Sequence, residues 1–179
     1  MSLHWVDKQK KEWTDNELDK MFIFCMLDRA MPYEKVCNAF NCLDTFGLTI
    51  RRHLRDTTEE NLVDLLKSTG FRFPNQTAKF LKEFSVNPID LRTASRDEIV
   101  KNVKGIGYKL ASMFLRNTRG INYAVIDVHI KNYMSELGYD INKSYKELEK
   151  DFYNVAKELN LDPYTLDMEI WQNRRIGNR

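Results

Sequence analysis

The chain has 179 residues, 42% of them hydrophobic and 12% aromatic, enough to bury a core as one domain or as two closely packed lobes. A formal net charge of +2 does not by itself indicate a nucleic-acid partner, because many proteins carry that balance as a solvated surface. No apolar run approaches the roughly 20 residues that cross a bilayer, and residues 1–12 lack the apolar core of a signal peptide. We therefore expect a globular protein of the cytoplasm with no membrane partner.

The cysteines indicate neither a disulfide framework nor a metal centre. Cys25, Cys37 and Cys42 fall inside helix-like segments, are odd in number and lack the spacing of metal ligands. The chain has no four-cysteine run of the kind that holds an iron–sulfur cluster. We therefore expect three reduced core thiols, no metal and no organic cofactor.

Helix start and stop signals run through the first half of the chain. Thr14 and Glu17 form a capping box ahead of an apolar helical face. Pro32 fits the first turn of a second helix, which Gly47 ends, and Pro74 opens a fourth. The helices predicted here cover residues 14–26, 32–47, 57–70 and 74–84.

The second half continues the same pattern. Ser95 and Glu98 form another capping box, and Asp162 with Pro163 opens the last helix. The helices predicted here cover residues 95–105, 108–117, 127–137, 144–161 and 162–171. Strand-like alternation is essentially absent, and the apolar run 123–126 is too isolated to make a sheet, so the predicted fold class is all-α.

The sequence of residues 103–109, Val-Lys-Gly-Ile-Gly-Tyr-Lys, predicts a tight hairpin between two helices at about 96–119. Gly105 and Gly107 flank one apolar residue, and glycine both tolerates positive φ and lets another molecule approach the backbone. The N–H groups that open the second helix then point outward, where the helix dipole favours an anion. With Lys104 beside it, we expect this hairpin to bind phosphate groups.

Basic side chains gather at three places in the sequence, one of them around the hairpin. Any one such cluster is more often solubilising charge, but three together favour a DNA partner. The clusters are Arg51, Arg52, His53 and Arg55; Lys101, Lys104, Lys109, Arg116 and Arg119; and Arg174, Arg175 and Arg179.

Lys109 is a candidate nucleophile. It lies one turn into the helix whose N-terminus would bind phosphate, where the dipole and the neighbouring cations disfavour the ammonium form. A neutral amine held against a sugar C1′ displaces a base and forms a Schiff base. From the pattern alone, a simple phosphate contact or a solvated lysine is an equally good interpretation of Lys109.

Asp127 is a candidate catalytic carboxylate, which would stabilise a cation-like sugar transition state and help to move protons. Taken alone, an aspartate before a helix is more typical of an N-cap. Its placement with Lys109 around one hairpin favours catalysis, because local structure does not require it. His129 is a candidate DNA-phosphate contact, with a surface or capping histidine as the safer interpretation.

An extruded base needs flat apolar walls and hydrogen-bonding groups at its edge. Phe71, Phe73 and Trp171 are candidates for those walls, although core packing is the commoner fate of helical aromatic residues.

Two stretches together, Gly105-Ile106-Gly107-Tyr108-Lys109-Leu110-Ala111 and Ile126-Asp127-Val128-His129, resemble the helix–hairpin–helix DNA glycosylase superfamily, and most of the chain takes part. More narrowly, the chain resembles the 8-oxoguanine DNA glycosylase/AP lyases of the second Ogg type, found mainly in archaea and some bacteria. The resemblance implies one glycosylase unit over residues 1–179, with two helical lobes and an active-site cleft between them. It assigns the Schiff-base nucleophile to Lys109 and the catalytic acid to Asp127. Because mono-functional members lack the lysine, a bifunctional enzyme is expected, associated with a prokaryotic nucleoid.

The tail adds a narrower resemblance to the same subfamily. Leu166-Asp167-Met168-Glu169-Ile170-Trp171 resembles its C-terminal region, in which the tryptophan stacks on the flipped base and the terminal residue helps to recognise it. The resemblance gives these roles to Trp171 and Arg179. The family pattern more often ends in lysine, which bears on base specificity more than on reaction type.

The sequence thus predicts a monomeric enzyme that excises an oxidised purine, 8-oxoguanine, from double-stranded DNA and then cleaves the abasic site by β-elimination. A glycosylase for a different lesion and a non-catalytic DNA-binding module that uses only the hairpin are the alternatives. A protein-interaction domain with an accidental glycine hairpin is a third, and it predicts no salt-dependent DNA binding.

Overall fold

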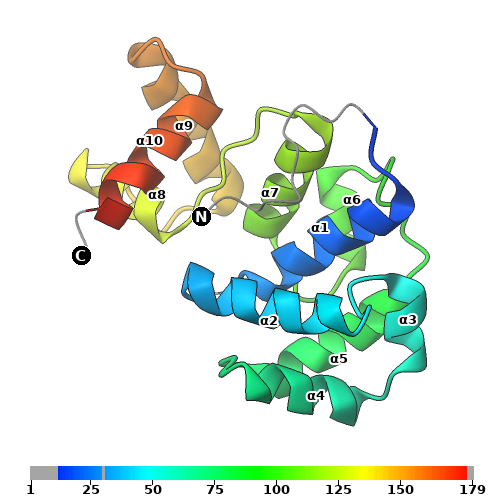
Figure 1. Ribbon diagram of the computed structural model, residues 1–179. Helices are drawn as coiled ribbons and strands as arrows, with labels where there is room; N and C mark the ends of the chain where they lie inside the picture. The colour runs from blue at the N-terminus through cyan, green and yellow to red at the C-terminus, as the bar shows by residue number, and fades with distance from the viewer. Residues whose placement is uncertain (1–11, 30, 177–179) are drawn as a thin grey trace. The chain divides into compact units, whose positions relative to one another are not determined.

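The computed structural model of the protein describes residues 12–29 and 31–176 and is helical, with no strand in these ranges (Figure 1). The all-α prediction is confirmed. Within the described residues, none of the helices has the length and apolar character needed to cross a membrane. The helices are α1 Asp15–Leu27, α2 Tyr33–Thr45, α3 Arg51–Asp56, α4 Glu59–Ser68, α5 Pro74–Ser85, α6 Arg96–Asn102, α7 Tyr108–Arg119, α8 Val128–Glu136, α9 Tyr145–Glu158 and α10 Pro163–Ile176.

The chain divides into two compact units, and the division falls inside α7. The N-terminal unit ends at Phe114, and the C-terminal unit begins at Leu115. The N-terminal unit therefore holds α1 to α6 and the first turns of α7, including Lys109, and the C-terminal unit holds Asp127 and α8 to α10.

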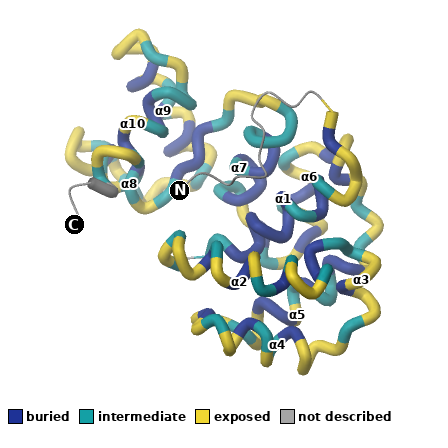
Figure 2. The backbone as a smooth tube through the Cα atoms, in the orientation of Figure 1, coloured by how far each residue is buried: buried dark blue, intermediate teal, exposed yellow. Residues whose placement is uncertain are grey.

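The N-terminal unit is built around α1, which is buried over its last two turns (Figure 2). Every residue from Met21 to Leu27 is buried, as expected for a helix that is apolar on all sides. The Phe22 ring stacks on Phe84 of α5 at 4.8 Å between centroids and meets the edge of Phe114 at 5.0 Å. This aromatic contact joins α1 and α5 to α7, the helix that carries Lys109.

The short helix α3 was not predicted from the sequence, where its residues were interpreted only as a basic cluster. Arg51 is half-buried, and its backbone N–H and Nε both donate to Asp19 of α1, at 3.0 and 2.6 Å. Its guanidinium also lies 5.0 Å from the centre of the Phe84 ring. Burial raises the pKa of Asp19, and the hydrogen bonds and charge of Arg51 oppose that rise. Arg51 therefore stabilises the fold of the unit.

The C-terminal unit has its own apolar core beneath an extended segment. Phe152 of α9, Ile130 and Met134 of α8 and Ile170 of α10 are buried together there. Residues 121–127 contain no helix and run across this core, with Ala124, Val125 and Ile126 buried. The unit thus places the end of that segment, Asp127, at the start of α8.

Several predicted boundaries differ from the structure. Pro32 is the N-cap of α2 and lies outside its first turn, so the helix begins at Tyr33. The last helix continues beyond the predicted Trp171 to Ile176. Cys25 is buried as predicted, whereas Cys37 and Cys42 are only half-buried, and all three are free thiols.

Candidate active site

The predicted hairpin connects α6 to α7, and Gly105 makes its turn. Gly105 has φ +83°, in the left-handed region that glycine adopts without strain. A Cβ atom at this position would lie 2.5 Å from Cδ2 of Phe80. Gly105 is therefore required both by the backbone conformation and by the packing of the Phe80 ring.

The surroundings of the hairpin are exposed and basic, as phosphate binding requires. Lys104 is 71% exposed, and its Nζ lies 3.2 Å from a Glu83 carboxylate oxygen. Gly107 is exposed, and a Cβ there would meet nothing within 4 Å. The first intrahelical bond of the next helix runs from the Ala111 N–H to the Gly107 carbonyl. The N–H groups of a helix's first turn point out of the helix, and this arrangement binds anions.

Substituting the two glycines should have different effects. We expect Gly105→Ala to lower the free energy of unfolding by about 1–3 kcal/mol, because alanine is strained at positive φ and displaces Phe80. Gly107→Ala should leave stability nearly unchanged, because the added methyl group meets nothing. If the hairpin binds phosphate as the sequence predicts, the same methyl group should weaken DNA binding. Thermal unfolding and DNA titration of both variants measure this; equal stability of the two would contradict the role given to Gly105.

Lys109 does not stand alone in the structure. Its Nζ lies 2.6 Å from Oδ2 of Asp28 and 3.5 Å from the Asp28 carbonyl oxygen. The two side chains are 30% and 22% exposed. From the sequence we expected only positive charge around Lys109. The Asp28 carboxylate was not predicted, because it lies 81 residues earlier in the chain.

Asp127 is the N-cap of α8. Its Oδ1 accepts the backbone N–H groups of His129 and Ile130 at 2.8 and 3.0 Å. Asp127 therefore caps a helix, as the simpler interpretation of the sequence predicted. Capping is compatible with catalysis, because the two backbone bonds use only Oδ1 of the carboxylate. They also hold the half-buried side chain in a fixed orientation.

Side chains of α9 and α10 hold the segment that ends in Asp127. The Ala124 N–H donates to the Tyr153 hydroxyl at 3.3 Å, and the Ile126 N–H donates to the Tyr145 hydroxyl at 3.1 Å. The Val125 N–H donates to Asp167 at 3.0 Å. These bonds satisfy backbone groups that a strand partner would otherwise satisfy, so the extended segment is stable without a sheet.

Asp167 also connects α10 to α7. Its carboxylate pairs with the Arg116 guanidinium, and both side chains are almost fully buried. Burial raises the pKa of Asp167, the nearby charge of Asp127 adds to the rise, and Arg116 and the Val125 N–H oppose it. Arg116, predicted as part of a basic cluster, is thus largely occupied by an ion pair inside the C-terminal unit.

The remaining predicted residues lie in different surroundings. Phe71 is buried, at 5% exposed, in the N-terminal unit, whereas Phe73 is 38% exposed beside the Arg72 guanidinium. His129 and Trp171 are half-buried on α8 and α10, which pack against each other. Arg179 lies outside the described residues. Within the units, the structure therefore groups Lys109 with the hairpin, and Asp127 with His129.

Comparison with known proteins decides the family. The model of the 8-oxoguanine DNA glycosylase family matches residues 4–161, most of the chain and both groups of residues described above. The chain belongs to the 8-oxoguanine DNA glycosylase family.

Relatives of this glycosylase match over most of their length. The 8-oxoguanine DNA glycosylase/AP lyase of Korarchaeum cryptofilum is 31% identical, with 90% of this chain and 82% of the relative covered. That of Picrophilus torridus is 35% identical, with 92% and 82% covered. The crystal structure of the Methanocaldococcus jannaschii 8-oxoguanine glycosylase/lyase, in complex with a 15mer DNA containing 8-oxoguanine, has a TM-score of 0.74, 28% identity and coverage of 94% and 85%.

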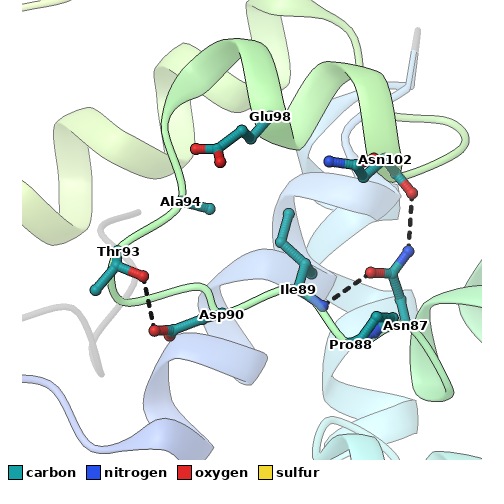
Figure 3. A pocket seen from close by; sticks show the side chains of 8 residues that line it. All are labelled: Asn87, Pro88, Ile89, Asp90, Thr93, Ala94, Glu98 and Asn102. Carbon is teal, nitrogen blue, oxygen red and sulfur yellow. Dashed lines mark hydrogen bonds between the residues drawn. The ribbon is translucent and has the colours of Figure 1, made fainter.

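The N-terminal unit of the glycosylase also has an open hollow of about 480 Å³ beside α6 (Figure 3). Its polar groups bond to one another: the Asn87 amide donates to the Asn102 carbonyl at 2.8 Å, and the Thr93 hydroxyl donates to Asp90 at 2.7 Å. The lining contains none of the predicted site residues. This hollow is therefore separate from the candidate site residues.

Proposed function

We propose that this protein is a bifunctional DNA glycosylase/AP lyase that excises 8-oxoguanine from DNA through Lys109. One observation carries the proposal. This chain belongs to the 8-oxoguanine DNA glycosylase family, and its Lys109 lies in the first turn of the helix that follows the glycine hairpin. The relatives that match it over most of their length are named 8-oxoguanine DNA glycosylase/AP lyase.

In this proposal, the hairpin binds the DNA backbone and Lys109 reacts with the damaged nucleotide. Gly105, Gly107, Lys104 and His129 contact phosphates. The Lys109 amine attacks C1′, the oxidised base departs, and a Schiff base forms between Nζ and C1′. Asp127 stabilises the positive charge that develops on the sugar. Loss of a C2′ proton then expels the 3′ phosphate by β-elimination and cleaves the strand.

The flipped base would be held by aromatic side chains. Phe73, which is exposed, and Trp171, which is half-buried, supply ring faces. Phe71 is buried in the core, which leaves Phe73 as the accessible ring of the two, and Arg179 would contact the base edge. The enzyme would act as a monomer, with its two units forming one glycosylase, on double-stranded DNA at the nucleoid in a prokaryotic cytoplasm.

The direct test uses duplexes that each contain one lesion. With an 8-oxoguanine duplex, we expect release of the free base and cleavage of the strand at the same site by the wild-type protein. Matched duplexes with an undamaged guanine, an oxidised pyrimidine or an alkylated purine should be processed far more slowly. Tight binding to DNA without release of any base would instead favour a non-catalytic hairpin module, and faster release of another lesion would change the substrate.

A further inference from the structure

The carboxylate of Asp28 is held beside the Lys109 amine by the buried end of α1. Asp28 is the C-cap of α1 and directly follows the buried run 21–27. Its own N–H donates to the carbonyls of Phe24 and Cys25 at 3.2 and 3.1 Å. Since core packing and these bonds fix its backbone, Asp28 has little freedom to move away from the lysine.

Two electric fields meet at the Lys109 amine. The N-terminus of α7 presents positive potential. The C-terminus of α1 presents negative potential, and its last turn has no basic residue of its own. The Asp28 carboxylate and carbonyl, 2.6 and 3.5 Å from Nζ, place negative charge directly beside the amine.

A protonated amine has no lone pair with which to attack C1′, so a lysine nucleophile needs a base. We propose that Asp28 is a catalytic residue that accepts the proton of Lys109 before attack on the sugar, an inference that rests on the proposed lysine chemistry. Asp28 is within hydrogen-bond distance of Nζ, as a general base must be. Asp127 caps α8 through Oδ1, and we assign it the separate role of stabilising the sugar cation.

The proton balance closes with these groups alone. The Lys109 ammonium transfers one proton to Asp28, which leaves a neutral amine and a neutral carboxylic acid. The amine lone pair forms the Nζ–C1′ bond while the C1′–base bond breaks. The electron pair of the broken bond leaves with the base, and the base then takes the proton from Asp28. The second Nζ proton moves to O4′ as the C1′–O4′ bond opens. The product is an iminium on Lys109, a hydroxyl at O4′ and Asp28 again as a carboxylate.

The test measures how fast the covalent adduct forms at saturating DNA. Borohydride reduces the iminium, so trapped adduct is counted against time for the wild type, Asp28→Asn and Asp28→Glu. We expect Asp28→Asn to slow trapping roughly a hundredfold, the usual contribution of a general base, and Asp28→Glu to recover part of the rate. DNA affinity should not weaken, because the substitution removes a negative charge.

Asp44→Asn is the matched control. Asp44 lies in the last turn of α2 and pairs with Lys20 at 2.7 Å, with side-chain exposures of 37% and 32%. It also accepts the Thr49 hydroxyl, a bond that the Oδ1 of asparagine can keep, so Asp44→Asn removes an ion pair away from Lys109. We expect this variant to form adduct at the wild-type rate. Its change in thermal midpoint measures what loss of such a pair does to stability alone.

The same comparison on a duplex with a preformed abasic site separates the possible roles. Because Lys109 must lose protons there too, Asp28→Asn should be slow on both duplexes; a defect on the 8-oxoguanine duplex alone would make Asp28 a contact of the base and overturn the proposal. Wild-type trapping rates in Asp28→Asn would overturn it while leaving the proposed function intact. Absence of any adduct with the wild-type protein would instead refute the lysine chemistry, and this inference with it.

Discussion

Lys109→Gln should form no covalent adduct with DNA and should release 8-oxoguanine at a rate lower by roughly a thousandfold or more, because an amide cannot attack C1′. Gel analysis after borohydride treatment and measurement of the free base give the two quantities. DNA binding should persist, since the hairpin and its glycines are unchanged.

Lys109→Arg is the control for the charge that Lys109→Gln removes. Arginine stays protonated, so it keeps the ion pair with Asp28 but provides no nucleophile. We expect it to be as inactive as Lys109→Gln while its stability remains near that of the wild type; for the glutamine variant the loss should be no more than about 1 kcal/mol, as for a partly exposed ion pair. Adduct formation by either variant would contradict the assignment of the nucleophile.

Asp127→Asn should reduce base excision by roughly 10²–10³-fold, the usual effect of removing a group that stabilises transition-state charge. Since asparagine caps helices about as well as aspartate, the bonds to the His129 and Ile130 N–H groups can persist in this variant. Stability and DNA affinity should therefore stay close to wild type while the single-turnover rate falls.

Asp127→Ala separates capping from catalysis. It removes both the charge and the cap, so we expect the same loss of rate together with about 1 kcal/mol of lost stability. If capping were the only role of Asp127, Asp127→Asn would excise the base at nearly the wild-type rate and only Asp127→Ala would be impaired. That outcome would contradict the proposal that the Asp127 carboxylate stabilises the sugar cation.

Local signals in the sequence predicted most of the helices. The capping boxes predicted at Thr14 and Ser95 are present in the structure, because a capping box involves residues only three positions apart. The helix α3 was missed because it is short and has no side-chain cap, and its stability comes from Arg51 bonding to Asp19. The predicted last helix ended too early at Trp171, although the stop signal in the sequence, Gly177, comes only after Ile176.

The candidate site was predictable only where it is local. The glycine hairpin, Lys109 and the capping position of Asp127 follow from short motifs whose geometry depends on neighbouring residues. The ion pair of Lys109 with Asp28 spans 81 positions, and the bond of Val125 to Asp167 spans 42. No spacing rule encodes such contacts, because tertiary packing creates them. Likewise, Phe71 and Phe73 have similar sequence surroundings, yet the fold buries one and exposes the other.

The most direct test of Lys109 as the nucleophile is to identify the residue that bonds covalently to DNA. The wild-type protein is incubated with an 8-oxoguanine duplex and borohydride, and the adduct is digested and analysed by mass spectrometry. We expect the peptide that contains Lys109 to carry the reduced sugar. A sugar attached to another lysine or to the terminal amine, or base release with no adduct at all, would contradict it.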